Sequence, residues 1–383
     1  MKGVGAPFAS RQQTMAPTRL PVFVDPPPPV RLPALHARWV AELLPGPLPA
    51  EPHATCGACA MLPPDDAPAE ASSLHFDAET RCCTYHPSLP NFLVGRVLRD
   101  PGPHPTASSE VLLARIAGRR AVSPLGVAPA DDVRARYEAA VNAGAFGRSP
   151  DLRCPHLRAD VAEGCGIWAH RNSTCATWFC KHDRGGRGMA LWSRLRELLA
   201  LAEARLARWC LVALELGDEA LARALPEADA PGRRGWAPEE GDVAWAAQWG
   251  RWRGREAEFY VACADRVDAL GWAEVARVCG ADADALARLV RGARAALDDD
   301  APLPTALRFG GGVSARVDAG EAVVHAYSHY DPLVVPGALV DVLRRFDGRP
   351  TGVVLAELEG EGVSLDASAL RQLVDFEVLV AAP

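Results

Sequence analysis

Lysine is nearly absent from this chain, since Lys2 and Lys181 are the only two among 383 residues. Almost all positive charge is therefore carried by arginine, which we interpret as a compositional bias that also produces the many Ala, Gly and Pro residues. The formal net charge is -7. This balance does not favour a nucleic-acid-binding or membrane-binding surface.

Long apolar runs are absent as well. No stretch of about 18 consecutive apolar residues occurs, so we expect no transmembrane helix. Residues 1–20 lack the apolar core of a signal peptide, and we expect the protein in the cytoplasm. The hydrophobic fraction of 49% is ordinary for a globular protein, and the length allows two or three domains.

The common catalytic signatures are also missing. We find no HExxH helix, no Walker loop, no dinucleotide fingerprint and no nucleophile triad. The Gly-rich stretch 181–188 is predicted to be a linker, because no strand precedes it and the Walker lysine is missing. No reaction follows from the residues, so the sequence leaves open whether the protein is an enzyme.

Cysteine, by contrast, is plentiful and grouped. Eight of the 11 cysteines lie between residues 56 and 180, and in a reducing cytoplasm such grouping favours metal or redox chemistry over disulfides. The candidate metal ligands are Cys56, Cys59, Cys82, Cys83, Cys154, Cys165, Cys175 and Cys180. The other three, Cys210, Cys263 and Cys279, occur singly in helical patterns and are predicted to be small buried hydrophobes.

The first cysteine group combines a C-x-x-C pair with two adjacent cysteines. Small residues between Cys56 and Cys59 let the backbone turn so that both sulfurs face one point. An acidic, Pro-rich insertion separates them from Cys82 and Cys83. Adjacent side chains rarely both bind one ion, so a core or supporting role for Cys82 or Cys83 stays open.

The second group runs from Cys154 to Cys180, with aromatic residues between the thiols. Trp168 either keeps water off an oxidisable cluster or packs in the core, as do Trp178 and Phe179. Arg171 either offsets the negative charge of a thiolate-bound cluster or lies at the surface. We predict Arg171 and Trp168 as cofactor-binding residues. Among the nearby histidines, His182 is the preferred candidate for a further ligand.

The order C-x-x-C, Cys-Cys, Cys-Pro-x-Leu, Gly-Cys-x-Ile-aromatic, Arg, Cys, aromatic-Cys resembles the YkgJ-type cysteine-cluster family over residues 54–182. The resemblance implies a zinc- or iron-chelating domain, and some relatives carry iron–sulfur clusters. Two positions depart from the family pattern: Asn172 stands where Pro is usual, and Trp168 replaces Tyr. The residues that match in kind are Cys154, Leu157, Cys165, Ile167, Trp168, Arg171, Cys175, Phe179 and Cys180.

The eight thiols leave several arrangements open. They suit two four-thiolate sites, either zinc or 4Fe-4S, or one cluster with spare thiols. Three functions follow: an iron–sulfur protein with a redox or peptide-modifying role, a structural zinc protein whose function is binding, or a metal-free adaptor. Thiolate ligands favour the first two.

Hydrophobic spacing predicts a helical bundle between and beyond the cysteines. Helices are expected over 35–44, over parts of 108–143, from 191 to near Gly217, and over 242–270, 272–278 and 282–296. Asp131 and Asp132 are expected to begin the second half of 108–143 as N-cap and first-turn residues. Trp residues are expected either to line a groove or to fill the core, the core being preferred: Trp236, Trp245, Trp249 and Trp252.

The C-terminal part changes to short strands and helices. Strands are expected at 313–317, 321–327 and 377–380, and helices at 337–346, 353–358 and 367–374, the last capped by Asp366. Residues 347–350 are expected to form a turn. This order is typical of a winged-helix-like module.

The phrase at 346–351, followed by two helices, is similar to PqqD-like peptide-recognition domains. The similarity implies a protein or peptide partner for this module. An edge strand of the module can take up such a partner by strand addition, whereas the absence of a basic surface disfavours DNA.

We therefore expect an α+β protein, mostly α. Its predicted parts are a Pro-rich lead-in (1–40), a cysteine-cluster metal-binding domain with a helical insert (41–188), a helical region (189–300) and a winged-helix-like module (305–383).

Overall fold

The computed structural model describes residues 32–57, 59–63, 75–100, 105–158, 160, 164–225, 241–298 and 302–383. Most of the predicted lead-in, most of the acidic insertion and Trp236 lie outside these residues. Helix exceeds strand in the described part, so the expectation of an α+β protein that is mostly α is confirmed.

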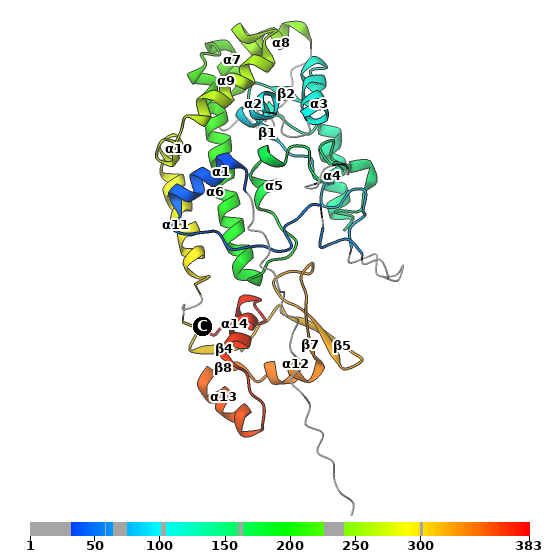
Figure 1. Cartoon of the computed structure of the whole chain (residues 1–383), viewed down its shortest axis with the longest axis vertical. Helices are drawn as coiled ribbons and strands as arrows, with labels where there is room; N and C mark the ends of the chain where they lie inside the picture. The colour runs from blue at the N-terminus through cyan, green and yellow to red at the C-terminus, as the bar shows by residue number, and fades with distance from the viewer. Residues whose placement is uncertain are drawn as a thin grey trace, which may run out of the picture.

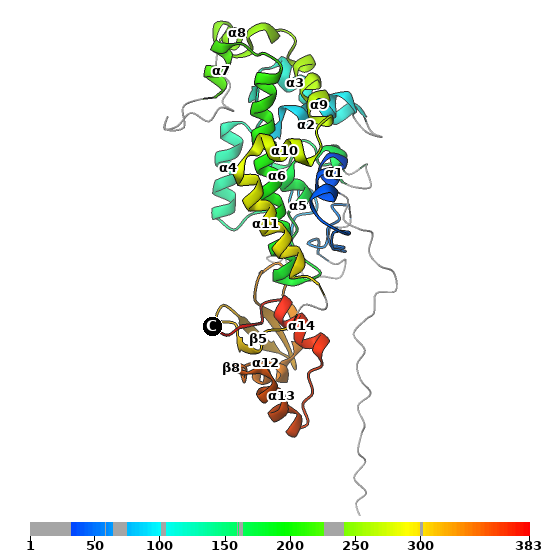
Figure 2. The same ribbon diagram turned by 90° about the vertical axis from the view of Figure 1, so that its left-hand side faces the viewer.

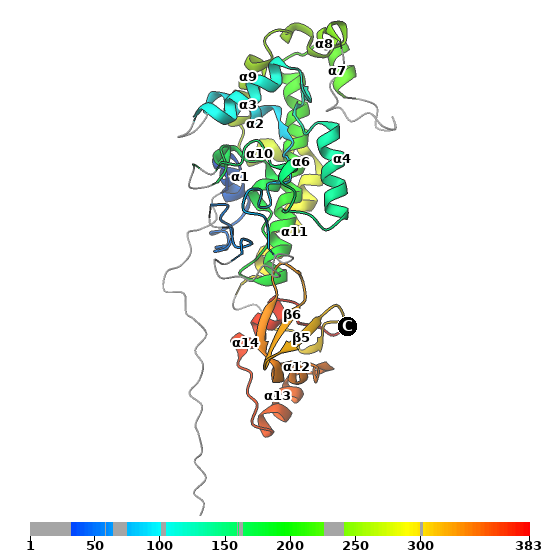
Figure 3. The same ribbon diagram turned by 90° about the vertical axis from the view of Figure 1, so that its right-hand side faces the viewer.

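The larger part of the molecule is organised around one long helix, α6 (Gly185–Ala213) (Figure 1). Leucines recur along its buried face at helical spacing, including Leu191, Leu195 and Leu206. Figures 2 and 3 show the other helices of this part arranged around it. They are α1 (Ala34–Leu43), α2 (Asn91–Arg99), α3 (Pro105–Ala117), α4 (Asp131–Asn142), α5 (Ser173–Thr177), α7 (Asp218–Ala224), α8 (Asp242–Trp249), α9 (Glu256–Asp268), α10 (Trp272–Cys279) and α11 (Ala281–Ala295).

A single hydrophobic core runs through this larger part, from Leu32 to Leu297. It includes Ile167 and Ala176 from the second cysteine group together with the buried face of α6. Residues of the predicted cysteine domain and of the predicted helical region therefore share one core. A small sheet of β1 (Leu89–Pro90), β2 (Val122–Ser123) and β3 (Gly126–Val127) lies within this part.

The C-terminal module has a core of its own, around Phe346, Leu307 and Leu379. One sheet has the order β8-β4-β9 and the other the order β5-β6-β7. The strands are β4 (Ala306–Phe309), β5 (Ser314–Asp318), β6 (Glu321–His325), β7 (Leu333–Pro336), β8 (Asp347–Pro350) and β9 (Leu379–Ala381). The helices are α12 (Gly337–Leu343), α13 (Thr351–Gly360) and α14 (Ala367–Asp375).

Several predicted elements are confirmed. The strand pair β5–β6 closes at Asp318 and Glu321. Asp366 is the N-cap of α14 and accepts a hydrogen bond from the Ala369 amide at 2.7 Å. The bounds of α1, α10 and α11 lie within one or two residues of the predicted ones. The three single cysteines are buried as expected. Trp245 and Trp249 are also buried, so the preferred core interpretation holds for these two.

Other predictions were wrong. Residues 181–188 are not a linker throughout, because α6 already begins at Gly185. The helix expected over 242–270 is interrupted between α8 and α9 by the 3-10 helix η4 (Gly250–Trp252), where Gly250 adopts a φ of 51°. The expected turn at 347–350 is strand β8, and the N-cap of α4 is Ala130 rather than Asp131. Strands β4 and β7 were not predicted.

The C-terminal module packs against the start of α6 (Figure 1). Nε of Arg184 lies 2.6 Å from Oδ2 of Asp375, which is buried. Gly185 has a φ of 50°, and an added Cβ there would lie 2.8 Å from the carbonyl oxygen of Asp375. A residue without a side chain is therefore required for this contact.

Candidate metal centre

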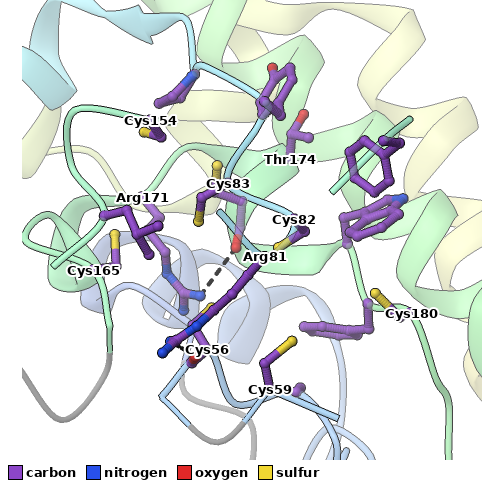
Figure 4. Close-up of a pocket in the computed structure, with 18 of the residues that line it drawn as sticks. Cys56, Cys59, Arg81, Cys82, Cys83, Cys154, Cys165, Arg171, Thr174 and Cys180 are labelled. Carbon is purple, nitrogen blue, oxygen red and sulfur yellow. Dashed lines mark hydrogen bonds between the residues drawn. The ribbon is translucent and has the colours of Figure 1, made fainter. Parts of the chain in front are cut away.

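The eight grouped cysteines all line one cavity of ≈ 630 Å³ (Figure 4). They come from stretches that are far apart in the sequence, and the first group meets the second. Cys56 and Cys59 therefore face the same space as Cys154–Cys180.

Backbone contacts hold the stretches together. The amide of Cys154 donates to the carbonyl of Cys83 at 2.7 Å, and Leu157 forms a β-bridge with Cys165. Arg81 donates to the carbonyl of Cys56. Gly164 has a φ of +69°, and an added Cβ there would lie 2.8 Å from Nη1 of Arg81. The glycine before Cys165 thus lets the two cysteine groups approach each other.

The short helix α5 positions Cys175. Asn172 is its N-cap and accepts a hydrogen bond from the Cys175 amide at 3.0 Å. The buried carboxylate of Glu203, on α6, accepts from the Ser173 amide at 2.6 Å and from its hydroxyl at 2.8 Å. Asn172 stands where the YkgJ-type pattern usually has proline. Proline has no side-chain acceptor, so it could not cap α5 as Asn172 does.

The charges that act on the thiols indicate two overlapping sets of four, because Cys83 acts on thiols of both sets. Burial raises the pKa of Cys154 and that of Cys180, and the charges of neighbouring thiols add to the effect: Cys83 and Cys165 act on Cys154, and Cys59 and Cys56 act on Cys180. Figure 4 shows Cys154 and Cys165 on one side, Cys59 and Cys180 on the other, and the adjacent Cys82 and Cys83 between them. The first set is Cys83, Cys154, Cys165 and Cys175. The second set is Cys56, Cys59, Cys82 and Cys180.

Most of the thiols are held in the neutral form. Burial raises the pKa of Cys56 to about 11 and that of Cys165 to about 12. Cys83 is the exception, because the Cys82 thiol donates a hydrogen bond to it and lowers its pKa. Reactive nucleophilic cysteines have lowered pKa values. The raised pKa values of most of these eight thiols therefore do not favour a nucleophilic role. Binding a cation is what deprotonates such thiols.

Arg171 is buried beside the thiols. It donates to the carbonyl of Cys175 at 3.1 Å and to that of Trp168 at 3.2 Å. Burial lowers its pKa, whereas the charges of Cys56, Cys165, Cys175 and Cys82 raise it. Trp168 does not appear among the cavity-lining residues and instead packs on Arg171. Its position is thus behind the guanidinium rather than at the thiols.

The lining of the cavity is cationic apart from the thiols. Four arginines line it, and among the described residues that do so there is no Asp or Glu. The arginines are Arg81, Arg148, Arg171 and Arg196. Nε of Arg81 is buried and has no hydrogen-bond partner in the described part of the chain. The cavity therefore offers charge and a donor that suit an anionic group.

The histidines do not follow the sequence prediction. His182 does not appear in the lining, and its ring instead lies between Phe179 and Tyr327, with centroids 6.0 Å away in each case. The preference for His182 as a ligand therefore has no support in this geometry. His156 lines the cavity, as does His329 from the C-terminal module.

Several lining residues were missed by the sequence analysis. Arg81 directly precedes Cys82, which was an available signal. Tyr137, Phe146 and Tyr330 come from other stretches, and nothing in the local sequence links them to the cysteines.

No single-ion site is apparent. Within the described residues, no three Cys, His, Asp or Glu side chains are placed so that they could hold one metal ion. The sulfurs are distributed around the cavity instead of meeting at a point.

No family model, no curated protein and no solved structure matches this chain. The YkgJ-type and PqqD-like resemblances therefore stay predictions. No helix in the described ranges is both long enough and apolar enough to cross a membrane.

Proposed function

We propose that this chain is an iron–sulfur protein whose eight grouped cysteines bind 4Fe-4S clusters. The observation that carries the proposal is the gathering of all eight thiols around one cavity without a single-ion site among the described residues. The YkgJ-type resemblance of the sequence is compatible with this proposal, since it implies a zinc- or iron-chelating domain and some relatives carry iron–sulfur clusters.

The spread of the thiols supports a cluster over a single zinc ion. Zinc–sulfur bonds of about 2.3 Å draw four sulfurs to within roughly 4 Å of one another. In a 4Fe-4S cluster each thiolate binds a different iron atom, so its ligands stand further apart. Thiols that line a cavity, as these eight do, suit the wider spacing of cluster ligands.

The number and charge of the lining groups support two clusters. Each set of four thiols supplies the ligands of one cluster. A 4Fe-4S core of charge +2 that is bound by four thiolates has a net charge of about −2. The positive charges of the four lining arginines offset the negative charge of two such clusters. When bound, the clusters would supply electron transfer or Lewis acidity, while the protein contributes burial, aromatic walls and the donors of Arg81 and Arg171.

A combination of spectroscopy and mutation tests the proposal. Protein purified without oxygen is expected to be brown, with an electron paramagnetic resonance signal after reduction. Cys175→Ser should remove part of this signal, and Cys279→Ala, in the helical core, should leave it intact. A colourless protein that contains zinc would replace the proposal with a structural zinc site.

We also propose that the C-terminal module binds a peptide along β5. Among the described strands of its sheet, β5 is at the edge, and Val317 in it is 57% exposed. Val317 is adjacent to the closing pair Asp318–Glu321, so its amide is at a position that faces the open edge. Main-chain pairing at such an edge is a common mode of peptide recognition.

Selection from a random peptide library tests the β5 proposal. Selected peptides should slow hydrogen exchange of β5 amides and bind the Val317→Pro variant weakly, since that variant loses an outward donor. Peptides that bind wild type and Val317→Pro equally would contradict it.

A further inference from the structure

We propose that the C-terminal module is a movable cover of the cysteine cavity, and that its loop between β6 and β7 closes the opening of the cavity near Cys180. Docking of the module limits the access of solvent and redox partners to the thiols, and its release increases that access. Thiols without a metal are shielded in the same way, so only the identity of the covered group rests on the proposed function.

The β6–β7 loop, residues 326–332, brings the module to the cavity. His329 and Tyr330 belong to this loop and line the cavity together with residues of the larger part. His329 is exposed and Tyr330 is half-buried, so the loop lies where the cavity meets solvent. The ring of Tyr330 packs edge-to-face on the buried Phe76 of the larger part, with centroids 5.6 Å apart. The loop therefore closes part of the opening.

The loop is anchored close to Cys180. The carboxylate of Asp331 accepts from the amide of His182, two residues after Cys180, at 3.2 Å. The same carboxylate accepts from the hydroxyl of Tyr327, which belongs to the module. Because Tyr330 directly precedes Asp331, this anchor holds the Tyr330 ring on the Cys180 side of the cavity.

Contacts within the module keep the loop in shape. The Ser328 hydroxyl accepts from the Tyr330 amide at 3.1 Å, and the rings of His329 and Tyr330 are stacked with centroids 3.8 Å apart. Val324 of β6 pairs with Leu333 of β7 at the base of the loop. These contacts do not involve the larger part, so the loop keeps its shape when the module moves.

The junction between the two parts is suited to movement. Figure 1 shows the module against one end of α6. Within the described chain, no residue belongs to both hydrophobic cores. Ion pairs of the buried Asp375 with Arg184, at 2.6 Å, and with Arg187, at 3.5 Å, join the two parts instead. Parts of a chain that share no large apolar interface are expected to move relative to each other.

Labelling with N-ethylmaleimide tests the inference on full-length protein purified without oxygen. Peptide mass spectrometry gives the rate at each cysteine, and rates are compared between samples of equal metal content. Cys180 should react about tenfold faster in Tyr330→Ala, which removes the ring from the opening, and about tenfold faster or more in Asp375→Ala, which releases the module. Tyr330→Phe keeps the ring and should react at the wild-type rate.

Two controls separate opening of the cover from general loosening. Asp341→Ala, in an exposed ion pair with Arg344 of the same module, should leave the Cys180 rate unchanged. Cys210, fully buried in the helical core, should stay unlabelled in every variant. Unchanged rates at Cys180 in both Tyr330→Ala and Asp375→Ala would overturn the inference, as would labelling of Cys210 that rises together with that of Cys180.

Iron and sulfide are measured on every sample, which separates the cover from the proposed function. An iron–sulfur protein whose Cys180 reacts at the wild-type rate in both variants refutes the cover alone. Faster labelling of Cys180 in both variants, in protein that contains no iron, supports the cover and refutes the proposed function.

Discussion

The guanidinium carbon of Arg171 lies 3.4 Å from the centre of the Trp168 ring. The ring thus covers one face of a cation that is buried next to the thiols. Cation–π contact of this kind is strongest where water is excluded. Trp168 therefore acts on the site through Arg171, by holding the guanidinium in place.

Replacing Arg171 should weaken the metal centre. Arg171→Met removes a buried positive charge beside the thiolates, and losing such a supporting group typically lowers metal affinity by about 10- to 100-fold. The measurement is the rate at which a chelator removes metal from the folded protein. Arg208→Met, on the exposed face of α6, should lose metal at the wild-type rate, and equally fast loss from both variants would contradict the assigned role.

The division into two sets predicts distinct effects for cysteines of either set. Cys175→Ser and Cys59→Ser should each leave about four iron atoms per chain rather than about eight, since each disables one cluster. Cys83→Ser should have a wider effect, because its charge acts on thiols of both sets. The measurement is the iron content per chain of the three variants, which shows whether one or both clusters are lost. Total loss in both Cys175→Ser and Cys59→Ser would point to one shared centre.

Glu51 should make stability depend on pH. Burial raises its pKa from the ordinary 4.5 to about 7, although hydrogen bonds from the Asp183 amide and the Trp192 indole act in the other direction. Between these two values the folded state keeps a proton that the unfolded state has lost. Stability should therefore fall as pH rises from 4.5 to 7, by roughly 3 kcal/mol at most, and level off above.

The Glu51→Gln variant isolates this effect, since it has no proton to lose. Urea unfolding followed by tryptophan fluorescence at pH 5 and pH 8 is the measurement. The difference between the two midpoints should be smaller in the variant than in wild type. Parallel behaviour of both proteins would show that Glu51 does not titrate as described.

The buried ion pair at the junction should hold the C-terminal module in place. Asp375→Ala leaves Arg184 without its carboxylate at 2.6 Å, and removing one partner of a buried pair typically costs about 3–5 kcal/mol. Amide exchange in α14, measured by mass spectrometry, should accelerate. Asp347→Ala, in the exposed pair with Arg349, is the matched control and should leave exchange in α14 unchanged.

The sequence predicted well those features that depend on local pattern. The strand pair β5–β6 follows from a two-residue turn at Ala319-Gly320, and the N-cap of α14 follows from Asp366. The eight cysteines were selected by grouping alone, and all eight line one cavity.

Features that depend on distant contacts were not predictable. Tyr330 reaches the cavity only because α14 and the β6–β7 loop dock on the start of α6. His182 was preferred for its closeness to Cys180 in sequence, but the backbone turns its ring towards Phe179 and Tyr327. The start of α6 at Gly185 was concealed by glycines, which are poor helix formers but here allow close contact with Asp375.

The most direct test of the account is the iron and acid-labile sulfide content of protein purified without oxygen. Two 4Fe-4S clusters predict about eight iron atoms and about eight sulfides per chain, with a broad visible absorption. About four of each would mean that only one of the two cysteine sets is occupied. Zinc without sulfide, or no bound metal at all, would contradict the proposal that the eight cysteines form an iron–sulfur centre.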